Sequence, residues 1–291
     1  MKILVIGGTR YFGIPMTKAL IAAGHQITIA TRGQTADPYG DAVSRIRFDR
    51  ADEAGIAAAF RGHAYDVIAD KIAYSSNDVR RLLEHVSCGR YILMSSAAVY
   101  GKMRENTPES DFDPAQYPLR WCERADADYA EVKRQAECAA VQYAAKNRMQ
   151  VTAVRYPVVI GAHDYTKRLY FYAACIRNGT PMQIDDPDAR LSLIHEQDAG
   201  NFLAHIADTA ISGAVNGCSD GDISVREILA YLEVRLGRKA ILRSDGTAAP
   251  YNGYPAFATL DTAKAKQTGF RFSDIRKAVS ETLDGYCAAL A

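Results

Sequence analysis

The chain has 291 residues, of which 48% are hydrophobic and 24% charged, and its formal net charge is +1. These values are ordinary for a globular protein large enough to bury a full core. A net charge so near zero offers no field to attract nucleic acid or an anionic membrane, and no apolar run approaches the ~20 residues that span a bilayer. The six cysteines include no C-x-x-C pair, which favours reduced thiols over a disulfide framework or a zinc site. We therefore expect a cytoplasmic protein that binds neither nucleic acid nor membranes.

The first half of the chain alternates strand and helix patterns. An apolar run at 2–6 predicts a strand buried on both faces, and a glycine turn leads from it into a helix at 12–23. Further strands are expected at 26–30, 45–48, 66–69, 90–96 and 150–156, with helices between them at 52–60, 76–86 and 125–147. This alternation is typical of a parallel sheet with helices on both faces, so we predict a doubly wound α/β fold of the Rossmann type.

The second half is less regular, because proline and glycine interrupt residues 157–188. Its clearest elements are expected as a helix at 165–177, a strand at 190–194 and a helix at 196–208. We interpret residues 1–160 as the Rossmann domain, with 189–210 returning to it, and 161–291 as a smaller mixed α/β lobe that binds substrate. The last helices are long enough to pair two copies of the chain, which leaves a homodimer open.

The first strand ends in a glycine-rich turn, GGTRYFG at 7–13, in which Arg10 holds the place where a third glycine is usual. A helix that starts after such a turn presents free N–H groups and a partial positive charge, and glycines let a pyrophosphate approach the backbone. The turn lies on the first strand of the alternating pattern, where dinucleotide-binding folds place it. We therefore predict a dinucleotide site formed by Gly7, Thr9, Arg10, Tyr11, Phe12 and Gly13.

The end of the second strand bears on the choice of cofactor. A site that prefers NAD usually has an acid there, which accepts hydrogen bonds from the 2′-OH of the adenosine ribose. This chain has Arg32 instead, and a guanidinium can bind a 2′-phosphate through paired charge-assisted bonds. Our hypothesis is that Arg10 and Arg32 clamp that phosphate, so that NADP(H) is favoured over NAD(H). The alternative is that both are solvated surface arginines.

Two further motifs, SSAAVYG at 95–101 and DYAEVKRQAE at 128–137, accompany the glycine turn. Together the three resemble the extended branch of the short-chain dehydrogenase/reductase superfamily, the NAD-dependent epimerase/dehydratase group. The GGTR-x-x-G variant is most similar to an atypical subset that includes the plastid stem-loop-binding proteins. The resemblance runs nearly from end to end, and it implies further cofactor contacts from Asp49, Arg50, Tyr156 and Pro157.

In that superfamily a serine, a tyrosine and a lysine perform the acid–base chemistry beside the nicotinamide, and the resemblance places these roles on Ser96, Tyr129 and Lys133. Lys133 follows Tyr129 by one helical turn, where its charge would lower the pKa of the phenol from ~10. Of the seventeen tyrosines, only Tyr129 has a lysine four residues later. Taken alone, a packed helix tyrosine beside a solvated lysine would be the simpler interpretation, but the combination of motifs favours catalysis.

The absence of particular residues narrows the reaction that the resemblance implies. Sugar dehydratases of this group carry an acidic pair, and reductive epimerases a cysteine, at the place of Ala97 and Ala98. The 4-epimerases resemble one another in an asparagine that contacts the nucleotide diphosphate, and Val158 stands there. We therefore favour an NADP(H)-dependent oxidoreductase acting on a carbonyl or alcohol of a small molecule. A sugar or nucleotide-sugar 4-epimerase with tightly bound NAD remains an alternative, as does a non-catalytic dinucleotide-sensing or RNA-binding module.

The roles of the segment 102–127, of His163 and of Asp198 are less sharply defined by the sequence. The polar segment 102–127 lies between Ser96 and Tyr129 in the sequence, so we expect it to border the cleft as either a lid or a solvated connector. His163 is expected either to contact substrate or to be held by a loop hydrogen bond, and Asp198 to orient a helix. None of the histidines has metal-ligand spacing, so we predict no metal.

Overall fold

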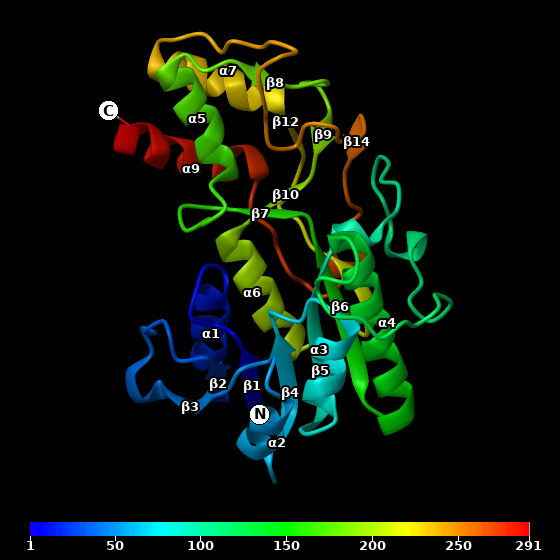
Figure 1. Ribbon diagram of the computed structural model, residues 1–291. Helices are drawn as coiled ribbons and strands as arrows, with labels where there is room; N and C mark the ends of the chain where they lie inside the picture. The colour runs from blue at the N-terminus through cyan, green and yellow to red at the C-terminus, as the bar shows by residue number, and fades with distance from the viewer. Residues whose placement is uncertain (291) are drawn as a thin grey trace.

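The computed structural model describes residues 1–290 and contains a seven-stranded parallel sheet in the order β11-β6-β5-β4-β1-β2-β3 (Figure 1). Its strands are β1 (Lys2–Ile6), β2 (Gln26–Thr31), β3 (Val43–Arg47), β4 (Ala64–Asp70), β5 (Ser87–Ser96), β6 (Gln150–Tyr156) and β11 (Gly213–Asn216). The strand order reverses between β1 and β4, so the carboxyl ends of these two strands form the topological switch point of a doubly wound sheet. The predicted Rossmann-type α/β fold is confirmed.

Helices cover both faces of the sheet. One face carries α1 (Gly13–Ala22) and α6 (Glu196–Ala207), and the other carries α2 (Glu53–Phe60), α3 (Ser76–Leu83) and α4 (Tyr129–Asn147). In β1, Ile3 and Val5 join the core on the first face, whereas Leu4 and Ile6 join the core on the second. The two-residue period of a strand divides them in this way, so β1 is apolar throughout. Within residues 1–290, no helix is long and apolar enough to cross a bilayer.

Glycine at position 200 lets the two helices of the first face meet. A Cβ on Gly200 of α6 would lie 2.5 Å from the carbonyl oxygen of Phe12 and 2.7 Å from the amide nitrogen of Met16. Both are backbone atoms of the segment that starts α1, so a larger residue would push α6 away. α6 therefore rests directly on the backbone that follows the glycine turn.

The rest of the chain adds a second lobe with a core of its own. Its helices are α5 (Arg168–Asn178), α7 (Val225–Leu236) and α9 (Ile275–Leu290), with the short strands β7 (Val158–Ile160), β8 (Met182–Gln183), β9 (Arg190–Leu191), β10 (Leu193–His195), β12 (Ile223–Ser224), β13 (Thr247–Ala248) and β14 (Phe257–Ala258). The short helix α8 (Ala263–Lys266) packs instead on the sheet, where Ala265 joins the core of the first face. The core shared by α5, α7 and α9 includes Tyr172, Leu232 and Leu283. Figure 1 shows these three helices together at one end of the molecule, beyond β7 and β10.

The strand expected at 190–194 is in fact two strands with different partners. β9 pairs with β12 and β14, whereas β10 pairs with β7. Ser192 stands between them, and its amide donates to the carbonyl oxygen of Ala258 at 3.0 Å. The period of a sequence shows that a segment is extended but not which neighbours it takes, so the change of partner has no local signal.

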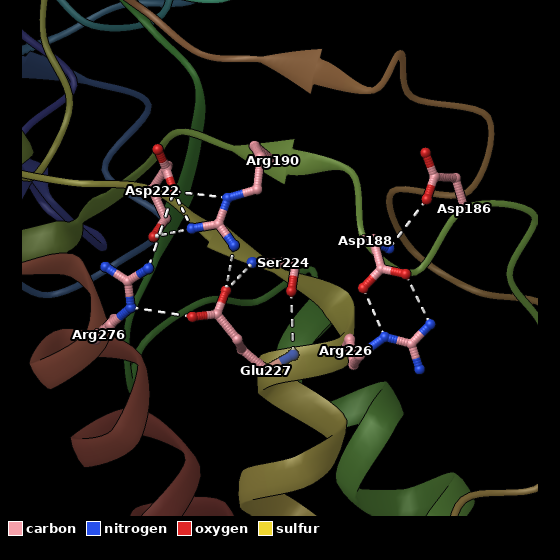
Figure 2. A network of polar contacts seen from close by, with 8 residues as sticks. All are labelled: Asp186, Asp188, Arg190, Asp222, Ser224, Arg226, Glu227 and Arg276. Atoms are coloured by element: carbon pink, nitrogen blue, oxygen red, sulfur yellow. Dashed lines mark hydrogen bonds and ion pairs between the residues drawn. The ribbon is translucent and has the colours of Figure 1, made fainter.

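A charged network fastens the second lobe (Figure 2). Arg190 of β9 donates to Asp222 and to Glu227 of α7, and Arg276 of α9 donates to the other carboxylate oxygen of Glu227. Ser224 caps α7 by accepting from the Glu227 amide, and its own amide donates to the Glu227 carboxylate at 2.8 Å. Burial acts to raise the pKa of Glu227, but the bonds from Ser224, Arg276 and Arg190 outweigh it and lower the pKa to about 2.

A buried ion pair links the sheet to α4. Arg155 of β6 and Glu137 of α4 are both fully buried, and Arg155 Nη2 donates to Glu137 Oε2 at 2.7 Å. The hydroxyl of Ser95 in β5 donates to the same carboxylate. Other N–H groups of the guanidinium donate to the carbonyl oxygens of Glu109 and Phe112, at 2.8 and 2.9 Å. The pair therefore holds β5, β6, α4 and the loop before α4 together.

That loop, residues 102–127, is fastened at further points along its length. The amide of Arg120 donates to Gln135 Oε1 of α4 at 2.6 Å. The amide of Cys122 donates to the Ser76 hydroxyl of α3 at 2.8 Å. Together with the bonds from the buried ion pair, these contacts favour a fixed connector over a lid.

We expect Arg155→Met to lower the free energy of unfolding by about 3–5 kcal/mol, because an uncompensated Glu137 carboxylate would remain in the core. Urea denaturation followed by circular dichroism measures the change. Arg235→Met is a matched control, because Arg235 pairs with Asp284 at the exposed surface and its loss should change stability little. Equal losses in the two variants would contradict a special role for the buried pair.

The contribution of Glu227 to the free energy of unfolding should depend on pH. Its folded pKa of about 2 lies below the ordinary 4.5, so the carboxylate stabilises the folded state above about pH 4.5, and this contribution is lost as the pH falls toward about 2. Glu227→Gln should therefore lower the urea midpoint near neutral pH, and its difference from wild type should shrink through that window. Glu281→Gln, at an exposed position of α9, is the control. A difference that stays constant at all pH values argues against the assignment.

Candidate functional site

The glycine turn forms a cradle at the start of α1. Gly7 and Gly8 both have a φ of +95°, a left-handed conformation that favours glycine. A Cβ on Gly13 would lie only 2.8 Å from Gly8 Cα, so the turn closes on itself only with glycine there. α1 begins after Phe12 with no side-chain cap and no acid in its first turn. The amides of Gly13 and Ile14 already donate to the carbonyl oxygens of Arg10 and Tyr11, so an anion would meet the preceding amides of the turn and the positive end of the helix dipole. The residues present therefore fit the pyrophosphate of a dinucleotide.

Two side chains of the turn meet the second lobe. Arg10 is exposed, and its guanidinium carbon lies 5.4 Å from the ring centroid of Tyr165, which follows β7. The ring of Tyr11 also contacts Tyr165, with the centroids 6.0 Å apart. The hydroxyl of Tyr11 is buried and has no hydrogen-bond partner within the described chain. The loop after β7 therefore borders the same cradle as the glycine turn.

A group of arginines lies near the carboxyl ends of β2 and β3. Arg32 follows β2 and is exposed, and the side chain of Arg47, the last residue of β3, lies 3.4 Å from the position of a Cβ on Gly33. Over residues 1–290, neither Arg10, Arg32 nor Arg47 forms an ion pair with an acid. No motif in the sequence marks Arg47. It lies opposite Thr31 because β2 and β3 pair in this register.

Two residues expected at the cofactor are engaged inside the protein. Arg50 donates to the Asp70 carboxylate and to the carbonyl oxygen of Asp78 at 2.9 Å. Tyr156 is buried, and its hydroxyl donates to the carbonyl oxygen of Ala199 in α6 at 2.7 Å. These polar groups stabilise the packing of α3 and α6 on the sheet, and the contact of the two residues with a cofactor stays a prediction.

Three other residues expected at the cofactor lie at the carboxyl edge of the sheet. They are Thr9, half-buried in the glycine turn, Asp49, exposed after β3, and Pro157, half-buried between β6 and β7. The carboxyl edge is where ligands bind in open α/β sheets. Their contact with a cofactor therefore stays a prediction.

The predicted catalytic residues meet at the end of β5. Ser96 is the last residue of β5, and Tyr129 is the first residue of α4. The helix expected from residue 125 begins at Tyr129 because Asp128 caps it, accepting a hydrogen bond from the Glu131 amide. The Ser96 hydroxyl, which accepts a hydrogen bond from the Ala98 amide at 3.2 Å, lies near enough to the Tyr129 phenol to act on its pKa. The cap thus fixes where the tyrosine stands relative to the serine.

Lys133 lies one turn further along α4 and is fully buried. Its ammonium donates to the carbonyl oxygens of Ala73 at 2.9 Å and Met94 at 2.7 Å. Burial lowers the pKa of Lys133 to about 8, although Glu137 acts to raise it. The ammonium therefore joins the segment after β4 to β5, close to the end where Ser96 stands.

Tyr129 is 48% exposed, so it can meet a ligand. Desolvation by the surrounding protein raises the pKa of Tyr129, while Ser96, Arg168 and Arg124 act to lower it. The charges that act on the phenol are those of two arginines from outside the helix. The lowering of the pKa expected from Lys133 is not found, because its ammonium donates to the carbonyl oxygens of Ala73 and Met94. The net effect is a phenol that keeps its proton more firmly than an ordinary tyrosine.

Aromatic and cationic side chains without a sequence motif surround Tyr129. The ring of Tyr74, after β4, meets the Tyr129 ring edge-on with centroids 6.2 Å apart. Arg124 lies 3.9 Å from the centroid of Tyr74, and Arg168 begins α5 in the second lobe. These residues come from separate parts of the chain, so only the fold reveals them. They give the site a rim suited to a polar or anionic small molecule.

The histidine expected near the cleft is paired with a carboxylate. His163 Nδ1 lies 2.8 Å from Glu196 Oε1, and the imidazole is 73% exposed. Two residues later in α6, Asp198 accepts hydrogen bonds from the hydroxyls of Ser219 and Ser273, at 2.7 and 2.6 Å. Asp198 therefore orients α6 and ties it to segments that follow it in the chain.

Comparison with known proteins agrees with this arrangement. The model of the NAD-dependent epimerase/dehydratase family matches residues 3–217. One curated relative is the chloroplast stem-loop binding protein of 41 kDa b from Arabidopsis thaliana, 31% identical over 115 residues, which are 35% of this chain and only 30% of that protein's length. Another is 2′-dehydrokanamycin reductase from Streptomyces kanamyceticus, 26% identical over 247 residues, which are 82% of this chain and 67% of that protein.

The fold also resembles a solved structure, UDP-glucose 4-epimerase from Thermus thermophilus in complex with NAD. The TM-score is 0.75 and the sequence identity 18%, over 99% of this chain and 100% of the other. At this identity the likeness shows the fold alone. Because it covers the whole chain, the second lobe as well as the sheet shares this architecture.

Proposed function

The chain belongs to the NAD-dependent epimerase/dehydratase family and is an NAD(P)-dependent enzyme; from this premise we propose that it is an NADP(H)-dependent oxidoreductase of a small-molecule carbonyl or alcohol. The observation that carries the proposal is that Arg32 and Arg47 lie at the carboxyl ends of β2 and β3, the expected adenosine end, and that no acid in the described chain is paired with either of them or with Arg10 in the glycine turn. A 2′-phosphate would supply the missing negative charge through charge-assisted hydrogen bonds.

The side chains around Ser96 divide the acid–base work. Tyr129 donates its phenolic proton to the substrate oxygen when a carbonyl is reduced, and its raised pKa keeps that proton in place until then. Ser96 holds the same oxygen by a hydrogen bond, and Lys133 keeps the strand ends beneath the substrate in position through its two carbonyl contacts. When bound, the nicotinamide would supply or accept the hydride.

The site best fits a polar, sugar-like substrate that is bound between the sheet and the second lobe. Arg124 and Arg168 place positive charge beside Tyr129, and the exposed Tyr165 offers a flat surface between the glycine turn and the catalytic tyrosine. Similarity to 2′-dehydrokanamycin reductase supports reduction of such a molecule. We propose that residues 161–291 supply most of these contacts, as a substrate lobe.

A 4-epimerase is the second candidate, favoured by the likeness to UDP-glucose 4-epimerase along the whole chain. Val158, which replaces the asparagine expected in such enzymes, weighs against it. Native mass spectrometry of the freshly purified protein separates the two. Firmly retained NAD or NADH favours the epimerase, whereas an empty protein that takes up NADPH in preference to NADH favours the oxidoreductase.

Arg32→Glu should weaken NADPH binding by about 10- to 100-fold, because it replaces a charge-assisted bond to the 2′-phosphate by repulsion. Binding of NADH, which lacks that phosphate, should change much less. Fluorescence titration with both reduced cofactors measures the two dissociation constants. Arg271→Glu, another exposed arginine, controls for the change in net charge. Tighter binding of NADH than NADPH by the wild type would contradict the proposed cofactor.

Tyr129→Phe should reduce turnover by about 10²- to 10⁴-fold, because the phenolic proton is lost, while the affinity for the cofactor stays unchanged. Tyr143→Phe, on the same helix with its hydroxyl bonded to Glu84, is the matched control and should retain activity. A panel of sugar aldehydes and ketones with NADPH provides the assay. Full activity of Tyr129→Phe would remove the tyrosine from the mechanism.

A further inference from the structure

A lysine stands at the switch point of the sheet, beside the glycine turn. Lys71 directly follows β4, and its amide donates to the carbonyl oxygen of Ile6, the last residue of β1, at 3.2 Å. A Cβ on Gly7 would lie 3.7 Å from Lys71 Cβ, so the base of the side chain lies against the turn. The ammonium nitrogen lies 4.4 Å from the ring centroid of Phe12, the residue before α1. The positive charge therefore stands close to the start of α1.

This ammonium has no counter-ion in the part of the chain that the structure describes. The lysines that do form ion pairs or side-chain hydrogen bonds there are Lys133, Lys239, Lys264, Lys266 and Lys277. Asp70, the preceding residue, cannot neutralise Lys71, because its carboxylate accepts hydrogen bonds from Arg50, from the Tyr91 hydroxyl and from two backbone amides. Burial lowers the pKa of Lys71 to about 8, and the like charge of Arg10 acts in the same direction.

A partly buried ammonium without a partner costs free energy, and an anion placed beside it would offset that cost. The anion that a dinucleotide brings to the start of α1 is its pyrophosphate, because the positive end of the helix dipole and the glycine turn meet there. The 2′-phosphate belongs to the end of β2, which lies on the other side of β1 from β4. Lys71 and Arg32 therefore serve different phosphates.

We propose that Lys71 is a pyrophosphate-binding residue, whose ammonium completes the anion site formed by the glycine turn and the start of α1. The inference rests on the proposed dinucleotide-dependent function and adds to it a residue that no motif marks. NADPH and NADH carry the same pyrophosphate, so Lys71 contributes to the affinity for both. Arg32 and Arg47 contribute to the affinity for NADPH alone.

Equilibrium binding of NADPH, NADH, ADP and AMP to the wild type and to Lys71→Met tests the inference without any turnover. Methionine keeps an unbranched stem but removes the charge, so the affinity for NADPH, NADH and ADP should fall by about 10- to 100-fold. AMP has no pyrophosphate, so its affinity should change far less. Lys71→Arg should restore part of the affinity.

The thermal stability of ligand-free Lys71→Met separates a binding role from a packing role. Removing an unpaired charge should leave the melting temperature unchanged or higher. Lys71→Gln takes the place of Lys71→Met if the methionine variant does not fold. Reduced affinity in a variant of undiminished stability therefore supports a contact with the pyrophosphate.

The remaining outcomes distinguish this inference from the proposed function. Equal affinity of the wild type and Lys71→Met for ADP and both dinucleotides overturns the role of Lys71 and leaves the proposed function intact. A loss confined to NADPH assigns Lys71 to the 2′-phosphate and also overturns the inference. Failure of the wild type to bind either dinucleotide overturns both.

Discussion

The contact between Arg155 and Glu137 determines where the reactive side chains stand. Glu137 lies about two helical turns after Tyr129 on α4, and its carboxylate also accepts a hydrogen bond from Ser95, the neighbour of Ser96. A fully buried carboxylate cannot be left without its cation, so β5, β6 and α4 keep their relative positions. The placement of the serine beside the tyrosine thus depends on an ion pair that contacts neither of them.

Local pattern was sufficient to predict six strands of the sheet but not the edge strand β11, which pairs with β6. A central strand is buried on both faces, so the sequence of β1 is a continuous apolar run, which glycines follow. The division of 190–194 into β9 and β10 has no such local pattern, because it depends on partners far away in the chain. The same holds for α4, where a capping carboxylate, not the run of helix-forming residues, decides where the helix begins.

The candidate site divides in the same way. The serine lies at the end of a strand, the tyrosine at the start of a helix and the lysine one helical turn later. All three positions can be predicted from local sequence patterns. Lys71 directly follows Asp70 in the sequence, and only the fold shows that the Asp70 carboxylate is turned toward Arg50. The pairing of β3 with β2 places Arg47 at the expected adenosine end, and the Tyr156 hydroxyl donates to α6. Both contacts depend on tertiary structure, so the sequence does not reveal them.

Net charge likewise says little about the charge that a ligand meets. The formal value of +1 includes many acids that are already paired, such as those of the network in Figure 2. Arg10, Arg32, Arg47 and Lys71, none of which forms an ion pair with an acid within residues 1–290, lie at the carboxyl edge of the sheet. A cleft lined by one sign of charge attracts counter-charged ligands whatever the total for the molecule.

The glycine at position 200 limits how this chain can be recombined with others. α6 is reached only after the chain has passed through the second lobe, yet it rests on the backbone of Phe12 and Met16. A piece cut after residue 160 would lack both α6 and β11, and the apolar face of α1 would lose its cover. No single seam separates a cofactor module from a substrate module, so exchange of the substrate lobe between homologues has to carry α6 with it or match its glycine.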